Sequence, residues 1–117
     1  MNALVIIYDG RPEYLARCLQ SVHDHLDLGW FEHRIIVDDS GMSEDDLELN
    51  VPTFDTIQHP RREGLAAAVQ SAWLACEGVD HLFHLEQDFV LTAAPPLDAM
   101  RRVLLDNPNV AQLVLRR

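Results

Sequence analysis

The chain has 117 residues, of which 48% are hydrophobic, which is enough for the core of one domain. It carries 19 acidic residues against 9 basic ones, for a formal net charge of -10, and every basic residue is arginine. This acidic excess argues against nonspecific binding to nucleic acid or to an anionic membrane surface. The lack of lysine excludes a lysine Schiff base and a P-loop lysine.

The first half of the chain predicts two buried strands separated by a helix. Residues 4–8 form a short continuous apolar run, typical of a strand that is covered on both faces. Pro12 opens a helix with an apolar stripe. The stripe consists of Leu15, Cys18, Leu19, Val22 and Leu26. Residues 34–37 form the second buried strand, and the acidic residues 42–52 predict a surface loop with one helical turn.

The second half continues the alternation of strands and helices. Residues 54–58 predict a third strand, residues 63–76 a helix that ends at Gly78, and the run from His81 a fourth strand. The apolar stripe of that helix is predicted from Leu65, Val69, Ala72, Trp73 and Cys76, with Trp73 in the core. A third helix follows residues 95–96, with Leu97, Met100, Val103 and Leu104 facing inward. Residues 110–115 predict a last strand.

Strands that alternate with helices of this length predict an α/β fold. We expect one domain over residues 1–117, with three α/β/α layers and a Rossmann-like, mostly parallel sheet. In such sheets the ligand lies beyond the carboxyl ends of the strands. Polar clusters occur at three predicted carboxyl ends, namely residues 8–11, 38–41 and 86–88. Their place at one edge of the sheet predicts a binding site there.

The fourth predicted strand ends in two acids, Glu86 and Asp88. Side chains alternate along a strand, so both acids are predicted on one side, with Gln87 pointing away. Together they could bind a divalent cation. The alternative is that they form a solvated strand end. His81 and His84 lie on different faces, so we interpret them as structural residues and not as zinc ligands.

Cys18 and Cys76 lie within apolar helical patterns, which predicts buried free thiols. No apolar run is long enough to span a membrane. The first residues lack the basic start and the cleavage site of a signal peptide. We therefore expect a cytoplasmic protein.

Four segments, in order, resemble the glycosyltransferases of the GT-A fold, family 2. The helix that starts at Pro12 resembles the first helix of that family, and residues 38–41 resemble its Asp-Asp-Gly-Ser motif. Residues 64–68 resemble its Gly-Leu-Ala-Ala-Ala helix start, and Glu86-Gln87-Asp88 resembles its Asp-x-Asp motif. The resemblance covers essentially the whole chain and implies binding of a nucleotide-diphospho-sugar, such as a UDP- or GDP-sugar, for transfer to an unknown acceptor.

The resemblance implies roles for the residues at the strand ends. Tyr8 and Asp9 would line the nucleoside pocket, and Asp38 or Asp39 would accept a hydrogen bond from the base or ribose. Arg61 or Arg62, with Arg62 favoured, would neutralise a phosphate beside a helix start, where negative charge is favourable.

The Asp-x-Asp-like motif implies a metal site. Asp88 would ligate Mn2+ or Mg2+ bridging the two phosphates, and Glu86 would reach the metal through water or contact the ribose. A hard cation there stabilises the charge that develops on the leaving diphosphate.

The chain also departs from the family pattern. Its motif begins with Glu86 in place of Asp, and family members are about twice as long, with an acceptor site and a catalytic base in their second half. No residue here matches that base, so the resemblance implies a donor-binding N-terminal half. The alternative function is an inactive nucleotide-binding or protein-interaction module of the same fold. An exposed edge on the last strand would allow a homo-oligomer.

Overall fold

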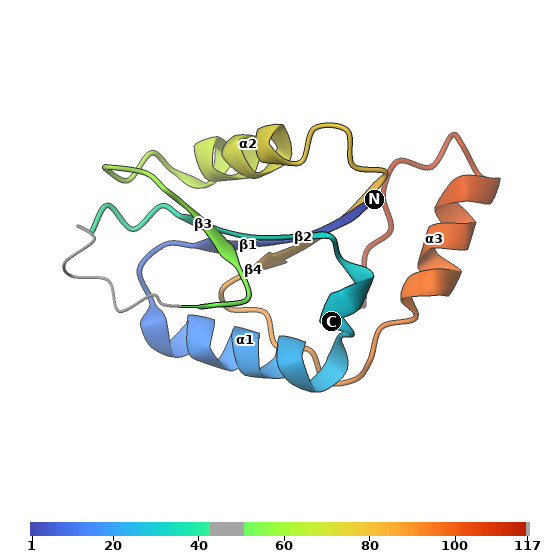
Figure 1. The fold of residues 1–117 in the computed structure, drawn as a ribbon, viewed down its shortest axis with the longest axis horizontal. Coiled ribbons are helices and arrows are strands. Elements are labelled where there is room, and N and C mark those ends of the chain that lie inside the picture. Colours follow the sequence, from blue (N-terminus) through green and yellow to red (C-terminus); the bar gives the residue numbers. More distant parts are fainter. Residues whose placement is uncertain (43–50, 117) are drawn as a thin grey trace.

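The computed structural model describes residues 1–42 and 51–116, which form an α/β fold with a parallel sheet (Figure 1). The elements are β1 (Asn2–Tyr8), α1 (Pro12–His25), the short helix η1 (Leu28–Trp30), β2 (His33–Asp38), β3 (Asp55–Gln58), α2 (Leu65–Ala75), β4 (His81–Glu86) and α3 (Leu97–Asp106). Of residues 42–52, for which a surface loop with one helical turn is predicted, residues 43–50 lie outside the described residues.

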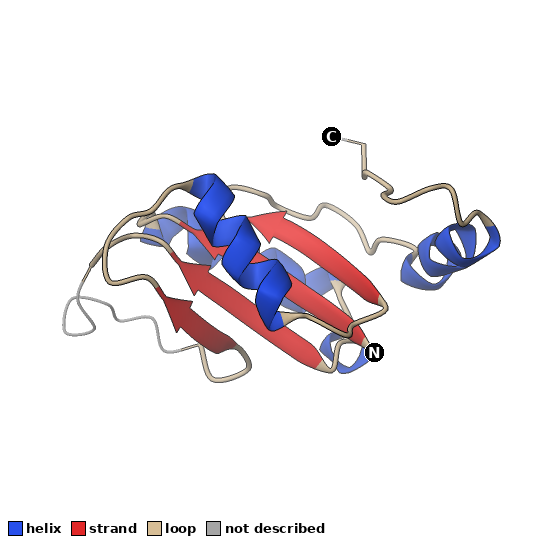
Figure 2. Cartoon of the chain, turned by 90° about the horizontal axis from the view of Figure 1, so that it is seen from above, coloured by secondary structure: helices blue, strands red, loops and turns tan. Residues whose placement is uncertain are grey.

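The four strands are parallel, in the order β3-β2-β1-β4. Helix α1 covers one face of the sheet and α2 the other (Figure 2). The predicted α/β/α class with a parallel sheet is thus confirmed. The chain moves from β1 to β2 and β3 on one side and then returns to place β4 on the other side of β1. The strand order therefore switches beside β1, where such sheets bind ligands.

Two apolar layers hold the helices on the sheet because β1 sends alternate side chains to opposite faces. Leu4, Ile6 and Tyr8 pack toward α1, whereas Val5 and Ile7 pack toward α2. On the α1 side the cluster includes Leu15, Cys18, Val22, Phe31 and Ile36. On the α2 side it includes Val37, Ala68, Ala72 and Cys76. Both cysteines are buried and free, as predicted.

The predicted apolar stripe of α2 is partly wrong. Ala68 and Ala72 face the sheet and are fully buried, whereas Trp73 points outward and is 61% exposed. Small side chains at these two positions allow the helix backbone to lie close to the β-branched residues of β1 and β2. The large side chains of the helix are therefore left on its outer surface.

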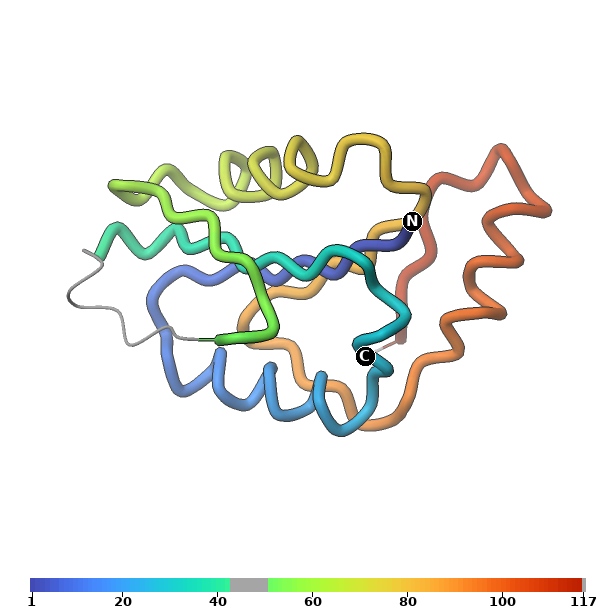
Figure 3. Tube along the Cα trace, in the orientation of Figure 1, coloured from blue at the N-terminus to red at the C-terminus, as the bar shows by residue number. Residues whose placement is uncertain are grey.

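The prediction of a last strand is wrong for residues 110–115, which pair with none of the four described strands. Val114 is 81% exposed. Helix α3 has no buried residue, so its predicted inward stripe is only partly covered, and Val103 is exposed. Figure 3 shows the reason: α3 and the tail lie beyond the end of the sheet where β1 begins, away from the path of a further strand. An apolar run becomes a strand only beside a partner.

Candidate functional site

A cleft of about 260 Å³ lies at the carboxyl ends of β1, β2 and β4. Ile7, Asp9, Arg11, Asp39, Arg62, Gly64, Leu65, Glu86, Gln87 and Asp88 line it. Five of these residues belong to the predicted site, namely Asp9, Asp39, Arg62, Glu86 and Asp88. The predicted convergence of polar strand ends thus brings acidic and basic side chains into one cleft.

The backbone hydrogen bonds between neighbouring strands continue for one residue past the ends of β2, β3 and β4. These bonds fix the positions at which the polar segments begin. The Asp39 N–H donates to the Tyr8 carbonyl at 2.8 Å, and the Gln87 N–H donates to the Ile7 carbonyl at 2.9 Å. On the far side of β2, the His59 N–H donates to the Asp38 carbonyl at 2.9 Å. The segments that line the cleft therefore start from fixed positions at the edge of the sheet.

Glu86 is the last residue of β4, and Asp88 lies in the turn that follows. The Phe89 N–H closes this turn by donating to the Glu86 carbonyl at 2.9 Å. Strand alternation therefore does not extend to Asp88, contrary to the sequence-based argument. The turn nevertheless brings both carboxylates to the same cleft, with Glu86 half-buried and Asp88 exposed.

Gln87 does not point away from the site. Its buried side chain accepts hydrogen bonds from the backbone N–H groups of Asp9 at 3.1 Å and Arg11 at 3.4 Å. Its amide group also donates to the Asp9 carboxylate. Gln87 thus holds the segment between β1 and α1 against the turn after β4. This role was not predicted, because Gln87 was expected on the other face of a strand that in the structure ends one residue earlier.

Asp39 joins the end of β2 to the start of α2. Its Oδ1 accepts from the Glu63 N–H at 2.8 Å and its Oδ2 from the Gly64 N–H at 2.9 Å. Burial alone would raise the pKa of this carboxyl, but these bonds and the one to His59 outweigh burial, and the pKa lies below its ordinary value. Asp39 is therefore an ionised anchor for the loop that carries Arg62.

His59 is a buried residue that the sequence argument did not single out. Its Nδ1 lies 2.8 Å from Asp39 Oδ1 and its Nε2 lies 2.8 Å from Ser71 Oγ. The connectivity is that of a catalytic triad, but Ser71 lies in the middle of α2, where backbone N–H groups bond within the helix and cannot form an oxyanion hole. We interpret the chain of bonds as a structural link. In the sequence, this role of His59 is indicated only by its position as a polar residue directly after β3.

Tyr8 and Asp38 do not line the cleft and are each 1% exposed. Tyr8 packs in the α1-side cluster, where burial raises the pKa of its hydroxyl and the charge of Asp38 raises it further. Asp38 Oδ1 accepts from the Ser40 N–H at 2.9 Å. Among the described residues Asp38 Oδ2 has no hydrogen-bond partner. A buried carboxylate oxygen of this kind needs a donor, so Asp38 retains an open acceptor position.

The two arginines of the cleft lie beside Asp9. Arg62 Nη2 donates to the Asp9 carbonyl at 2.5 Å, and Arg11 Nε lies 3.9 Å from the Asp9 carboxylate. Gly41 permits this arrangement, because a Cβ there would lie 2.8 Å from the Arg62 backbone nitrogen and its φ of +71° disfavours other residues. Arg61 does not line the cleft.

The acids of the cleft do not by themselves form a complete metal site. Within residues 1–42 and 51–116, no group of three or more His, Cys, Asp or Glu side chains is placed to hold a metal ion. Glu86 and Asp88 supply two carboxylates, and Mg2+ typically takes one or two carboxylates with water and substrate phosphates. The Cys18 thiol does not line the cleft, and burial raises its pKa to about 11, which favours the neutral thiol.

No model of a known protein family matches the chain, and no curated protein matches it. In the part of the chain that the structure describes, no helix has the length and apolar character needed to cross a membrane. The geometry of the cleft is therefore the basis for inferring a function.

Proposed function

We propose that the chain binds a nucleotide-diphospho-sugar, such as a UDP- or GDP-sugar, through Mn2+ or Mg2+ as the donor-binding part of a family 2 glycosyltransferase of the GT-A fold. The observation that carries this proposal is the convergence of Glu86 and Asp88 with Arg62 and the start of α2 in one cleft at the switch in strand order. The cleft thus offers oxygen ligands for a hard cation beside groups that favour phosphate.

The charges around the cleft support a metal-dependent mode of binding. Four carboxylates line it, from Asp9, Asp39, Glu86 and Asp88, against the two guanidinium groups of Arg11 and Arg62. The excess of two negative charges would repel a diphosphate. A divalent cation at Glu86 and Asp88 would neutralise this excess, so nucleotide affinity should depend on the metal.

The start of α2 is suited to phosphate. Gly64 and Leu65 line the cleft, and the first N–H groups of an α-helix have no partner within the helix. Asp39 accepts the N–H groups of Glu63 and Gly64, which orients the helix start without using the N–H groups that follow. Arg62, held by the Asp9 carbonyl, adds a guanidinium on the same side.

Sugar transfer would use these groups to stabilise the leaving diphosphate. The metal, when bound, would supply Lewis acid stabilisation of the phosphate oxygens. Arg62 and the helix start would favour the same negative charge, and Gln87 would keep the segment from Asp9 to Arg11 in place. Of the two acids at the end of β2, only Asp39 lines the cleft and would be placed to accept a hydrogen bond from the base or ribose. We assign the general base and the acceptor site to no residue of this chain.

A thermal shift titration with UDP and GDP tests the proposal. We expect each nucleotide that binds to raise the unfolding midpoint in Mn2+ and to have little effect in EDTA, because only the folded state holds the ligand. AMP at the same concentration is the control for a diphosphate requirement. If neither UDP nor GDP raises the midpoint in millimolar Mn2+, the proposed function is wrong. Release of sugar from a nucleotide sugar would separate an enzyme from an inactive nucleotide-binding module.

A further inference from the structure

Helix α2 is apolar on both faces. No residue of Leu65–Ala75 is charged. Ala68 and Ala72 are fully buried against the sheet, yet on the outer surface Leu65, Trp73 and Leu74 are 54%, 61% and 66% exposed. A helix that is apolar all round is normally buried on all sides. Its outer surface therefore has the character of an interface.

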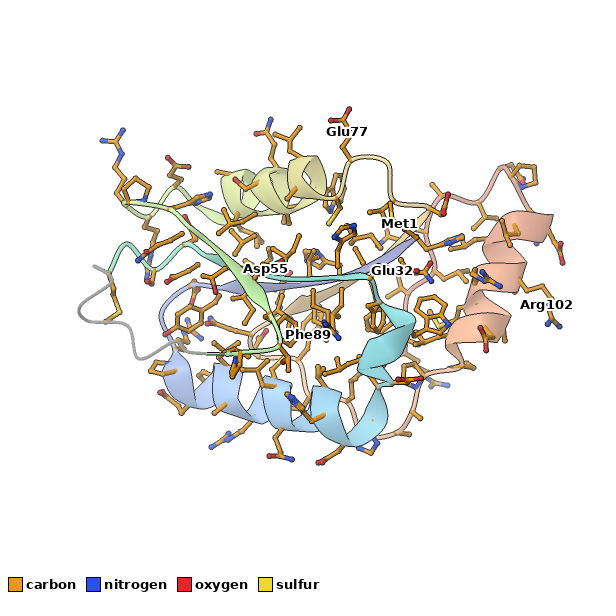
Figure 4. The ribbon with its side chains drawn as sticks, in the orientation of Figure 1. Met1, Glu32, Asp55, Glu77, Phe89 and Arg102 are labelled. Carbon is orange, nitrogen blue, oxygen red and sulfur yellow. The ribbon has the colours of Figure 1, made fainter. Side chains whose placement is uncertain are left out.

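The outer surface of α2 forms a shallow groove of about 460 Å³. Ala66, Val69, Gln70, Trp73, Leu74 and Glu77 line it. These positions recur at intervals of three and four residues, so they form one continuous stripe along the helix. Glu77 follows the end of α2 and points away from the sheet (Figure 4). We call this stripe the α2 outer face.

We propose that the α2 outer face binds the same face of a second copy, with the two helices antiparallel. Within the groove, the bulky Trp73 and Leu74 lie toward one end and the small Ala66 lies toward the other. A twofold axis between Val69 and Gln70 places Trp73 of each copy on Ala66 of the other. The same surface of each copy thus forms the interface, and each contact occurs twice about the twofold axis, as in most homodimers.

The charge distribution determines where two copies can meet and in which direction. With a net charge of -10, two copies repel each other, and the repulsion is smallest where the surface carries no charge. The exposed Arg61 precedes α2 and Glu77 follows it. Antiparallel packing brings Glu77 of one copy to the arginine end of the other and opposes the two helix dipoles. Parallel packing would instead bring the two Glu77 side chains together.

The size of the contact sets its strength. Helix α2 has 11 residues, or about three turns, and a pair of such helices buries less than the ~1,600 Å² of a standard interface. The dimer should therefore be weak and should exchange with monomer in the micromolar range. Leu65 belongs to both α2 and the cleft, so the second copy would lie beside the proposed nucleotide site.

Sedimentation velocity over about 5 to 500 μM protein tests the dimer. We expect the average mass to rise from 13.3 kDa toward twice that value as concentration increases. Leu74→Glu should keep the chain monomeric at the highest concentration. Leu105→Glu is the matched control, because Leu105 is 62% exposed on α3 and should leave dimerisation unchanged. A wild-type chain that stays monomeric throughout, or a Leu74→Glu variant that dimerises equally well, would overturn the proposal.

Cysteine cross-linking tests the antiparallel direction. Gln70 lies next to the proposed axis, so Gln70→Cys should form a disulfide-linked dimer under mild oxidation, whereas Glu77→Cys should not, because its two copies would be about 20 Å apart. The native Cys18 and Cys76 are buried, so the cross-linking of the wild-type chain gives the background level of disulfide formation. Efficient linkage through position 77 but not through position 70 would contradict the arrangement. A monomer that binds zwitterionic lipid vesicles through Trp73 would assign the α2 outer face to a membrane and overturn the dimer.

Discussion

At the carboxyl end of the sheet, hydrogen bonds accepted by Asp39 and Gln87 and donated by Arg62 join the connecting segments. The opposite end of the sheet contacts α3 through a few partly exposed side chains. Trp30 Nε1 donates to Asp98 Oδ1 at 3.1 Å, and Leu97 packs at the border of the α1-side cluster. Figure 1 shows the two regions beyond opposite ends of the strands. The comparison indicates that polar residues fix the cleft in one geometry, while α3 adds little to the stability of the core.

Removal of Asp39 should give the largest loss of stability. Asp39→Ala leaves the N–H groups of Glu63 and Gly64 and the ring of His59 without their acceptor, and we expect a loss of about 3 kcal/mol in the free energy of unfolding. Urea denaturation measures this loss. A decrease below about 1 kcal/mol would show that the cleft is held by other contacts.

The contribution of Asp39 should also depend on pH. Its folded-state pKa lies below the ordinary value of 3.8, so its stabilising effect is complete above that value and is lost as pH falls toward the folded-state pKa. The difference in unfolding free energy between the wild type and Asp39→Asn should therefore be constant from pH 7 to about pH 5 and shrink below about pH 4. A difference that grows in acid would contradict the lowered pKa.

Replacement of Gln87 should have an intermediate effect. Gln87→Met keeps the approximate size but removes the acceptor of two backbone N–H groups, so we expect a loss of about 1–2 kcal/mol. Amide hydrogen exchange at Asp9 and Arg11 should become faster, because their segment is no longer held to the turn after β4. Unchanged exchange at both amides would rule out a positioning role for Gln87, whether or not the cleft binds nucleotide.

Loss of the contact to α3 should have the smallest effect. Trp30→Phe removes the exposed hydrogen bond to Asp98 and retains most of the aromatic packing on Phe31. We expect a loss of no more than about 0.5 kcal/mol by the same denaturation assay. A loss as large as that of Asp39→Ala would mean that α3 is part of the cooperative core.

Continuous apolar runs predicted the strands well, because β1 and β2 are covered on both faces and need no alternation. Parallel pairing then explains why Asp9, Asp39 and Glu86 could be placed at one edge from sequence alone. The orientation of α2 could not be predicted, since a helix with apolar residues on all sides has no unique inward stripe. The bonds of Gln87 and His59 depend on segments far apart in sequence. Residues 110–115 have strand composition, but their structure depends on where α3 leads the chain.

In the proposed function, Asp88 helps bind a metal and a nucleotide in the cleft. Calorimetric titration of UDP and GDP into the wild type and Asp88→Ala, with and without Mn2+, measures this contribution. Asp106→Ala, on exposed α3, is the matched control for loss of an acidic residue. We predict metal-dependent binding by the wild type and by Asp106→Ala, and none by a folded Asp88→Ala. Equal metal-dependent affinity in all three proteins would contradict the account.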